Sequence, residues 1–243
     1  MMVQMGQQDV IGNNLANLNT AGFKKDHAAF RARLDKAMYR VASPQNGQSA
    51  TMTQLGMISA GATIDQISSS YSQGELRQTD NPLDLGLKGQ GFLAVKTEQG
   101  VAYTRNGACK IDEQSRLVNG SGHAILGQGG EIYLPGKGKV QIGEDGAITV
   151  DGTLVDHLRL VNVNDPLGQL QKRGDSYYYL VSGSEEAATE LSVQQGFLES
   201  STVNPIQEMV SMITAMRTYE GSQRALSSQD EVLGRAVNDI ARL

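Results

Sequence analysis

The side chains that could do chemistry in this 243-residue chain are its carboxylates, three histidines and one cysteine. His27, His123 and His157 are far apart and lack the short ligand spacings of a zinc site. Cys109 is alone, which excludes an internal disulfide and a cysteine-based metal cluster, and its apolar neighbours predict a buried side chain. The acids are scattered, no Gly-x-Ser-x-Gly nucleophile motif occurs, and there is no Trp to line a sugar cleft. We therefore expect no catalytic residue, no metal and no cofactor.

Two glycine-rich runs, 127–130 and 136–138, raise the question of phosphate binding. Neither run is followed by the Gly-Lys-Ser/Thr of a P-loop, and neither opens a helical pattern whose N-terminus would attract a phosphate. Both runs are therefore interpreted as turns.

The bulk composition excludes several classes of partner. A formal net charge of −5 argues against nucleic acid. No apolar run approaches the ~20 residues of a transmembrane helix, so we expect no direct membrane insertion. The first residues, MMVQMGQQDV, lack the basic region and apolar core of a cleavable signal. The chain is therefore expected either to stay in the cytoplasm or to leave it by a route that cleaves no signal.

Amides are the unusual polar side chains of this sequence. The stretch NNLANLNTAGFKK is rich in Asn, which is costly inside a helix because the amides compete with the backbone for hydrogen bonds. Ile11, Leu15 and Leu18 nevertheless keep a helical spacing through it. Gly22 could take a left-handed position that ends this helix near Thr20. A helix packed among other chains could satisfy such amides, which predicts an assembly surface made of Asn13, Asn14, Leu15, Asn17, Asn19, Gly22 and Phe23.

Composition divides the chain into four parts. Residues 1–40 have helical patterning that continues through Phe30, Leu34, Ala37 and Met38, and residues 41–70 are polar, as in a linker or extended segment. Residues 71–204 contain short alternating runs separated by turn signals, which predict an irregular antiparallel β domain. The expected fold class is α+β, mostly β, with helices on both sides of the β domain. The candidate strands are Phe92–Val95, Ala102–Arg105, Ala108–Asp112, Lys139–Ile142, Ala147–Val150, Leu158–Val163 and Tyr177–Val181.

Residues 205–243 predict a long C-terminal helix that pairs with the N-terminal segment. Asn204 offers an N-cap, Pro205 stands at the first helical position, and Gln207 follows three residues after the cap. Apolar residues then recur every seven positions, which is typical of a coiled-coil seam. The seam is longer than the first helix can cover, so its excess predicts contacts with other chains. The seam residues are Met212, Ala215, Tyr219, Leu226, Leu233 and Ile240.

Three stretches resemble signatures of the bacterial flagellar rod and hook protein family. They are NNLANLNTAGFKK, then GELRQTDNPLDLGLKGQGFLAV with AYTRNGACKIDEQSRLVNGSGHAILG, and finally GFLESSTVNPIQEMVSMITAMRTYEGSQRAL. The resemblance covers nearly the whole chain. It implies a self-assembling structural subunit and not an enzyme. Its terminal helices would pair as a coiled-coil-like inner domain that lines a hollow, torque-transmitting tube, with the β domain outside.

The resemblance also implies partners and a location. The partners would be other copies of this chain, neighbouring flagellar rod and hook proteins, and the flagellar type III export apparatus. The location would be the periplasm-spanning rod of the flagellar basal body, reached without a cleaved signal peptide. Chain length favours the rod over the hook. The run DHLRLVNVNDPLGQLQKRGDSYYYL and the ending SSQDEVLGRAVNDIARL favour the proximal rod, with the distal rod as the close alternative.

Two further points remain open at this level. Members of the family usually carry more helical residues before the position of Gln8, so either the start of this sequence is misassigned or trimmed, or this member has a short first helix. A secreted β-rich binding module or adhesin on a helical stalk fits the coarse pattern as well, although a stalk does not need the Asn-rich helix. An enzyme with dispersed catalytic residues is the second alternative, and a deep pocket with converging titratable groups would favour it.

Overall fold

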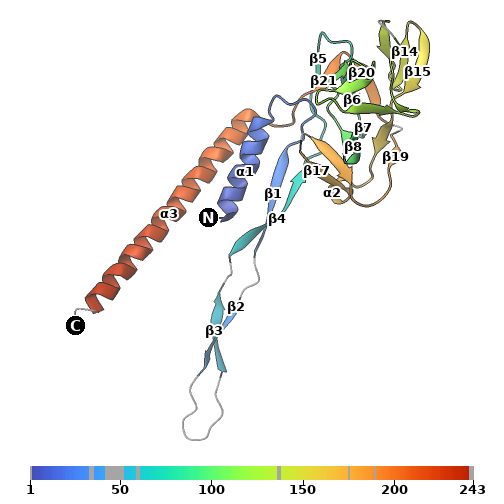
Figure 1. The fold of residues 1–243 in the computed structure, drawn as a ribbon. Coiled ribbons are helices and arrows are strands. Elements are labelled where there is room, and N and C mark those ends of the chain that lie inside the picture. The colour runs from blue at the N-terminus through green and yellow to red at the C-terminus, as the bar shows by residue number, and fades with distance from the viewer. Residues whose placement is uncertain are drawn as a thin grey trace. The chain divides into compact units, whose positions relative to one another are not determined.

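The computed structural model describes residues 2–32, 36–41, 52–58, 61–135, 138–174, 176–188 and 190–240. The chain divides into two compact units, and many of their elements are labelled in Figure 1. The helix-and-ribbon unit comprises Met1–Gly12, His27–Ser68 and Val210–Leu243, and the β unit comprises Asn13–Asp26 and Ser69–Met209. Within the part of the chain that is described, no helix is both long enough and apolar enough to cross a membrane.

The helix-and-ribbon unit combines two long helices with paired strands. Its elements are α1 (Met2–Ala16), β1 (Asp26–Ala32), β2 (Lys36–Val41), β3 (Met52–Ile58), β4 (Ala62–Ser69) and α3 (Pro205–Ile240). Strand β1 pairs with β4, and β2 pairs antiparallel with β3. The unit boundary falls inside four of these elements. The end of α1 (Asn13–Ala16), the first residue of β1 (Asp26), the last residue of β4 (Ser69) and the start of α3 (Pro205–Met209) belong to the β unit.

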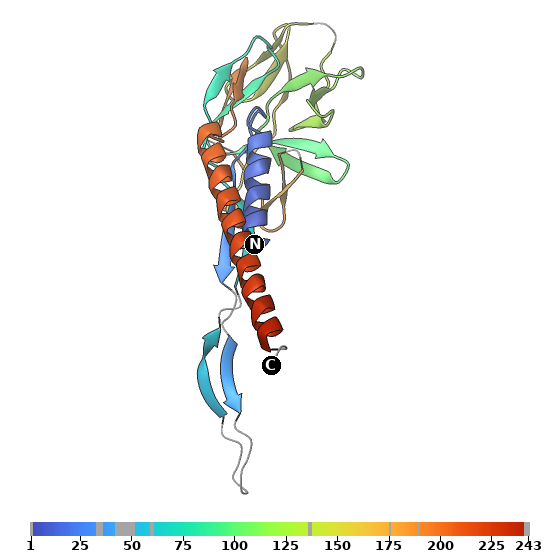
Figure 2. The same ribbon diagram turned by 90° about the vertical axis from the view of Figure 1, so that its left-hand side faces the viewer.

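Helix α1 lies alongside the first part of α3 in both views (Figures 1 and 2). The Gln4 amide donates a hydrogen bond to the Ser222 hydroxyl at 3.2 Å. A Cβ placed on Gly12 would lie 3.8 Å from the Met212 methyl. On another side of α1, a Cβ on Gly6 would lie 2.0 Å from Cδ1 of Ile64 in β4, so the strand meets the helix closely at this point. Helix α1 therefore touches both α3 and β4.

The β unit is built from short strands and one short helix. They are β5 (Leu76–Gln78), β6 (Leu85–Lys88), β7 (Phe92–Thr97), β8 (Gly100–Thr104), β9 (Cys109–Ile111), β10 (Leu117–Asn119), β11 (Ala124–Gly127), β12 (Gly130–Glu131), β13 (Val140–Ile142), β14 (Ala147–Val150), β15 (Thr153–His157), β16 (Leu160–Asn162), α2 (Pro166–Gln169), β17 (Leu170–Arg173), β18 (Tyr177–Leu180), β19 (Glu186–Ala187), β20 (Ser192–Gln195) and β21 (Phe197–Glu199).

One large antiparallel sheet organises the β unit. Its strand order is β17-β18-β8-β7-β11-β10-β9, with β12 beside β11 and β16 beside both β7 and β19. A three-stranded sheet β13-β14-β15 and the pairs β20-β6 and β21-β5 complete the unit. Neighbouring strands in the sequence pair through short turns, and antiparallel hairpins require no longer connection.

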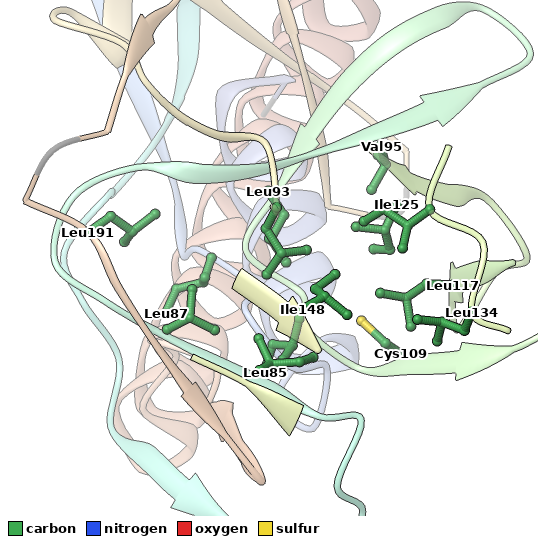
Figure 3. Close-up of a cluster of buried hydrophobic side chains, with 14 of the residues drawn as sticks. Leu85, Leu87, Leu93, Val95, Cys109, Leu117, Ile125, Leu134, Ile148 and Leu191 are labelled. Atoms are coloured by element: carbon green, nitrogen blue, oxygen red, sulfur yellow. The ribbon is translucent and has the colours of Figure 1, made fainter. Parts of the chain in front are cut away.

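The core lies on both faces of the large sheet. Along β7, Leu93 and Val95 enter one buried cluster, while Phe92 and Ala94 enter a second cluster with Tyr103. Successive side chains of a strand point to opposite faces, so the continuous apolar run of β7 is the mark of a strand covered on both sides. Figure 3 shows the first cluster, in which the Cys109 sulfur lies among leucine and isoleucine side chains.

Much of the expected architecture is confirmed. The α+β, mostly β class is correct, and every strand predicted from an alternating run overlaps an observed strand. Helix α3 begins at Pro205, as predicted, and the Asn204 carboxamide oxygen accepts hydrogen bonds from the amides of Ile206 (3.1 Å) and Gln207 (3.2 Å). The Cys109 side chain is buried, and this burial raises its pKa to about 12.

The helical pattern expected after the first helix was wrong. Phe30 lies in β1, Ala37 and Met38 lie in β2, and Leu34 is outside the described residues. Residues 41–70, expected as a linker or extended segment, contain β3 and β4, which are the partners of those strands. A short apolar run fits either period, and pairing with a segment far along the chain decides between them. Helix α1 also ends at Ala16 and not near Thr20.

Candidate functional site

A five-residue strap, residues 22–26, follows the turns after α1 and is docked in the β unit. Gly22 has φ +67°, and a Cβ there would lie 2.4 Å from the Arg105 carbonyl carbon and oxygen, so only glycine fits. Its amide donates to the carbonyl oxygen of Glu199 at 2.7 Å. Gly22 has the positive φ predicted for it, but it serves close docking of the strap and does not cap α1.

The next strap residue, Phe23, is a buried plug. The residue is 2 % exposed, and the Lys172 ammonium lies 3.8 Å from the ring centroid, which is a cation–π contact. Its carbonyl oxygen accepts a hydrogen bond from the amide of Thr202 at 3.1 Å. Phe23 thus packs within its own chain, between β17 and the segment that leads into α3.

A buried ion cluster, here named the Glu199 cluster, consists of Lys24, Arg105 and Glu199. The Lys24 ammonium lies 2.6 Å from Glu199 Oε1, and Arg105 Nη1 lies 3.1 Å from Glu199 Oε2. The amide of Gly74 also donates to Oε1 at 2.7 Å, and Lys24 donates to the carbonyl of Ser72 at 2.6 Å. The Glu199 side chain is 0 % exposed, and each of its carboxylate oxygens has a cationic partner.

The charges of the Glu199 cluster are unequal, because two cations share one carboxylate. Arg105 relieves part of the excess, since it also donates to the carbonyl of Gly89 and lies over the Phe92 ring. Burial lowers the pKa of Lys24, while the attraction of Glu199 opposes that shift. Removing one partner of such a buried pair is costly, because the other charge is left uncompensated.

A second network, here named the Glu208 cluster, joins Asn14, Lys25, Asp26 and Glu208. The Asn14 amide donates to the Asp26 carbonyl at 2.9 Å and accepts from the Asp26 amide at 2.9 Å. The same amide nitrogen lies 3.5 Å from Glu208 Oε2, and the Lys25 ammonium lies 2.6 Å from Glu208 Oε1. The Asp26 carboxylate in turn pairs with Lys172 at 2.8 Å.

Asn14 therefore uses its amide inside the chain. The other predicted asparagines differ: Asn17 is half-buried and donates to the Asn13 carbonyl at 2.9 Å, while Asn13 and Asn19 are exposed. Leu15 is half-buried. Because α1 ends at Ala16, only Asn13 and Asn14 are helical, and the amides of Asn14 and Asn17 have partners within the chain.

The predicted seam of α3 is covered only in its first part. Met212 and Tyr219 are half-buried and Ala215 is 4 % exposed, in the stretch that runs beside α1. Leu226 and Leu233 are 48 % and 62 % exposed. Ile240 is the last residue of α3, and its side chain lies outside the described residues.

Helix α3 also carries a second apolar stripe, which the seven-residue spacing had hidden. Val210, Ile213 and Met216 are all more than half exposed. At about 100° per residue, Ile213 lies roughly 160° around the helix from Ala215, so the stripe is on the side away from the seam. The same helix begins with exposed Ile206 and Met209. The spacing of three and four residues through this set is a sequence signal that could have identified it.

The charged residues of both clusters were missed by sequence reasoning. Lys24 and Glu199 lie 175 residues apart in the chain, so no local spacing connects them. The available signal was the place of Lys24, Arg105, Glu199 and Glu208 inside the stretches that resemble the family's signatures.

Comparison with known families finds three matches along the chain. Residues 1–24 match the family described as "Flagella basal body rod protein", and residues 86–150 match "Flagellar hook protein FlgE/F/G D1 domain". Residues 194–239 match "Flagellar basal body rod FlgEFG protein C-terminal". Each matched region contributes one member of the Glu199 cluster: Lys24, Arg105 and Glu199 in turn.

Curated relatives resemble the chain over nearly its whole length. The flagellar basal-body rod protein FlgG of Bacillus subtilis is 32% identical over 255 residues, covering 95% of this chain and 92% of the relative. The flagellar basal-body rod protein FlgF of Escherichia coli is 32% identical over 250 residues, covering 96% of this chain and 91% of the relative. FlgF of Caulobacter vibrioides is 29% identical over 238 residues. The chain thus reaches 32% identity with a relative of each name.

Proposed function

Because this chain belongs to the family of flagellar basal-body rod proteins and is a structural subunit of that rod, we propose that it assembles through the two apolar faces of α3. The observation that carries the proposal is the exposed second half of the seam, which includes Leu226 and Leu233. Contiguous exposed apolar side chains on a helix mark a surface at which another protein packs.

The proposal assigns a part to each predicted assembly residue. Met212, Ala215 and Tyr219 pair with α1 of the same chain in a coiled-coil-like manner, while Leu226, Leu233 and Ile240 pack against other copies. Asn13, Leu15, Asn17 and Asn19 lie on the α1 surface that meets neighbouring helices. Asn14, Gly22 and Phe23 hold the end of α1 in place. The assembled helices would line a hollow tube with the β unit outside.

We further propose that the subunit reaches the rod through the flagellar export apparatus and occupies its proximal part, where it contacts neighbouring rod and hook proteins without entering a membrane. The compact β unit and the sequence of residues 156–180 support the proximal position, and the distal rod is the alternative. An epitope tag inserted between β2 and β3 should label purified hook–basal bodies at the membrane-proximal end of the rod. Label at the far end would assign the distal rod. Intact, unlabelled basal bodies would favour a secreted binding module.

The assembly surface is tested by Leu226→Asp in a strain that swims only with this chain. We expect the purified variant to keep the free energy of unfolding of the parent chain, because the side chain is already exposed. Motility in soft agar should be lost, because assembly would bury the new charge in an apolar contact. Ala225→Asp, on an exposed position about 100° around the helix from Leu226 and between the two apolar faces, is the matched control and should swim. A swimming Leu226→Asp strain would contradict the assignment.

A further inference from the structure

Glu208 is an acidic residue in the first turn of α3, yet it is almost fully buried. Its residue surface is only 2 % exposed. A solvent-exposed acidic side chain at this position would interact equally well with the positive end of the helix dipole. Burial of a carboxylate requires specific partners, so the partners of Glu208 are the informative feature.

Both partners of Glu208 come from the N-terminal part of the chain. Oε1 pairs with the Lys25 ammonium at 2.6 Å, and Oε2 lies 3.5 Å from the amide nitrogen of Asn14. Asn14 belongs to the last turn of α1, and Lys25 belongs to the strap. One side chain of α3 therefore contacts two segments that lie more than 180 residues earlier, as the 194-residue separation from Asn14 shows.

The contacts also connect the strap to α1 independently of α3. The Asn14 amide makes two hydrogen bonds with the Asp26 peptide, both 2.9 Å long, in the manner of a neighbouring strand. The Asp26 carboxylate is then held by Lys172 at 2.8 Å and by the Ser69 hydroxyl at 2.5 Å. Loss of Glu208 would release Lys25 and the first turn of α3, and it would remove the acceptor that holds Asn14, and with it the Asp26 peptide, beside that turn.

We propose that Glu208 is a positioning residue that couples the last turn of α1 to the first turn of α3, so that the two helices enter the rod as a defined pair. The proposal rests on the rod function described above. It predicts that the Glu208 carboxylate matters for its pairing with Lys25 and Asn14, and not simply as a negative charge at a helix N-terminus.

The test uses the full-length chain and a direct reporter, the amide of Asp26, which donates to Asn14. In Glu208→Gln we expect hydrogen exchange at the Asp26 and Lys25 amides to be at least tenfold faster than in the parent chain. Exchange at the β7 and β8 amides should stay within twofold. Glu208→Asp should restore part of the protection. Glu220→Gln is the matched control, because its partner Arg224 forms an exposed pair on the same helix, and it should leave exchange unchanged.

A charge swap separates pairing from simple helix-end electrostatics. Lys25→Glu and Glu208→Lys should each disturb the strap and reduce swimming, and the double variant should recover at least part of both. If Glu208→Gln prevents folding, Lys25→Met carries the same test, because Lys25 is partly exposed and its loss removes the same pair. Unchanged exchange in Glu208→Gln, or a swap without any recovery, would overturn the proposal.

The two proposals fail in different ways. If basal bodies purified from cells with the parent chain lack this protein, the rod function is wrong, and the exchange measurements still decide the coupling. If the parent chain is present in the rod and loosening the strap by Glu208→Gln leaves swimming unchanged, the positioning role is wrong while the rod function stands.

Discussion

The two units of this molecule differ in how many of their apolar side chains they bury. The β unit buries two hydrophobic clusters, one on each face of its large sheet. In the described residues of the helix-and-ribbon unit, the buried hydrophobic side chains are those of Val10, Ile11 and Ala215. Apolar side chains that this unit leaves exposed include Met38, Tyr39, Met57, Ile213, Met216, Leu226, Leu233 and Val237.

This difference indicates which unit is complete by itself. A unit with a closed core is stabilised by its own burial, at about 25 cal/mol per Å² of apolar surface. A two-stranded ribbon such as β2–β3 is at best marginally stable in water, and an amphipathic helix needs a second surface. The β unit therefore behaves as a folded domain, whereas the helix-and-ribbon unit has the composition of a surface that other chains complete.

The largest predicted effect is a loss of stability when the Glu199 cluster of the β unit loses its carboxylate. In Glu199→Gln we expect the free energy of unfolding to fall by about 3–5 kcal/mol, because Lys24 and Arg105 remain buried without their carboxylate. Urea unfolding of the purified chain measures the loss. Glu220→Gln on α3 removes an exposed pair with Arg224 and should change stability by about 0.5 kcal/mol or less. Equal losses in the two variants would contradict the contrast between the units.

The next effect compares two leucines of the same size in the two units. Leu93→Ala leaves a cavity in the first buried cluster and should cost about 2–5 kcal/mol. Leu226→Ala removes an exposed side chain and should cost about 0.5 kcal/mol or less in the isolated chain. In cells we nevertheless expect Leu226→Ala to lose motility clearly, although its cost to the stability of the isolated chain is small. A stability loss in Leu226→Ala close to that of Leu93→Ala would show that α3 is already covered within its own chain.

Local patterns explain why most of the β unit and the start of α3 were predictable. A hairpin strand is marked by alternation and by the turn that follows, and both lie within a few residues. The α3 start at Pro205 has its own cap in Asn204, and the seam repeats within one helix. By contrast, β1 and β2 are strands because β4 and β3 pair with them, and that information lies elsewhere in the chain.

The charged clusters were not predictable for a related reason. A lysine or glutamate in a sequence is normally assigned to the surface, because burial of a charge is costly without a partner. Lys24 has its partner 175 residues away, and Glu208 has one in Asn14, 194 residues away. For Asn14 the sequence did identify the residue, because asparagine is unusual in a helix. Its role, two hydrogen bonds to the Asp26 peptide, could be seen only from the position of Asp26 in the fold.

The smallest predicted effect is a pH dependence that comes from one proton on Lys24. Burial lowers the pKa of Lys24 below its ordinary value of 10.5, so between the lowered pKa and 10.5 the unfolded chain binds more protons than the folded chain. The contribution of this lysine to stability should therefore rise with pH in that window, and it should be flat below it. Urea midpoints of the parent chain and of Lys24→Met, measured from pH 8 to 10.5, isolate it, because other titrating groups are common to both proteins. A parent-minus-variant difference that falls with rising pH would mean that the attraction of Glu199 outweighs burial and raises the pKa of Lys24. The charges of the Glu199 cluster would then stabilise the β unit more than the sharing of one carboxylate by two cations indicates.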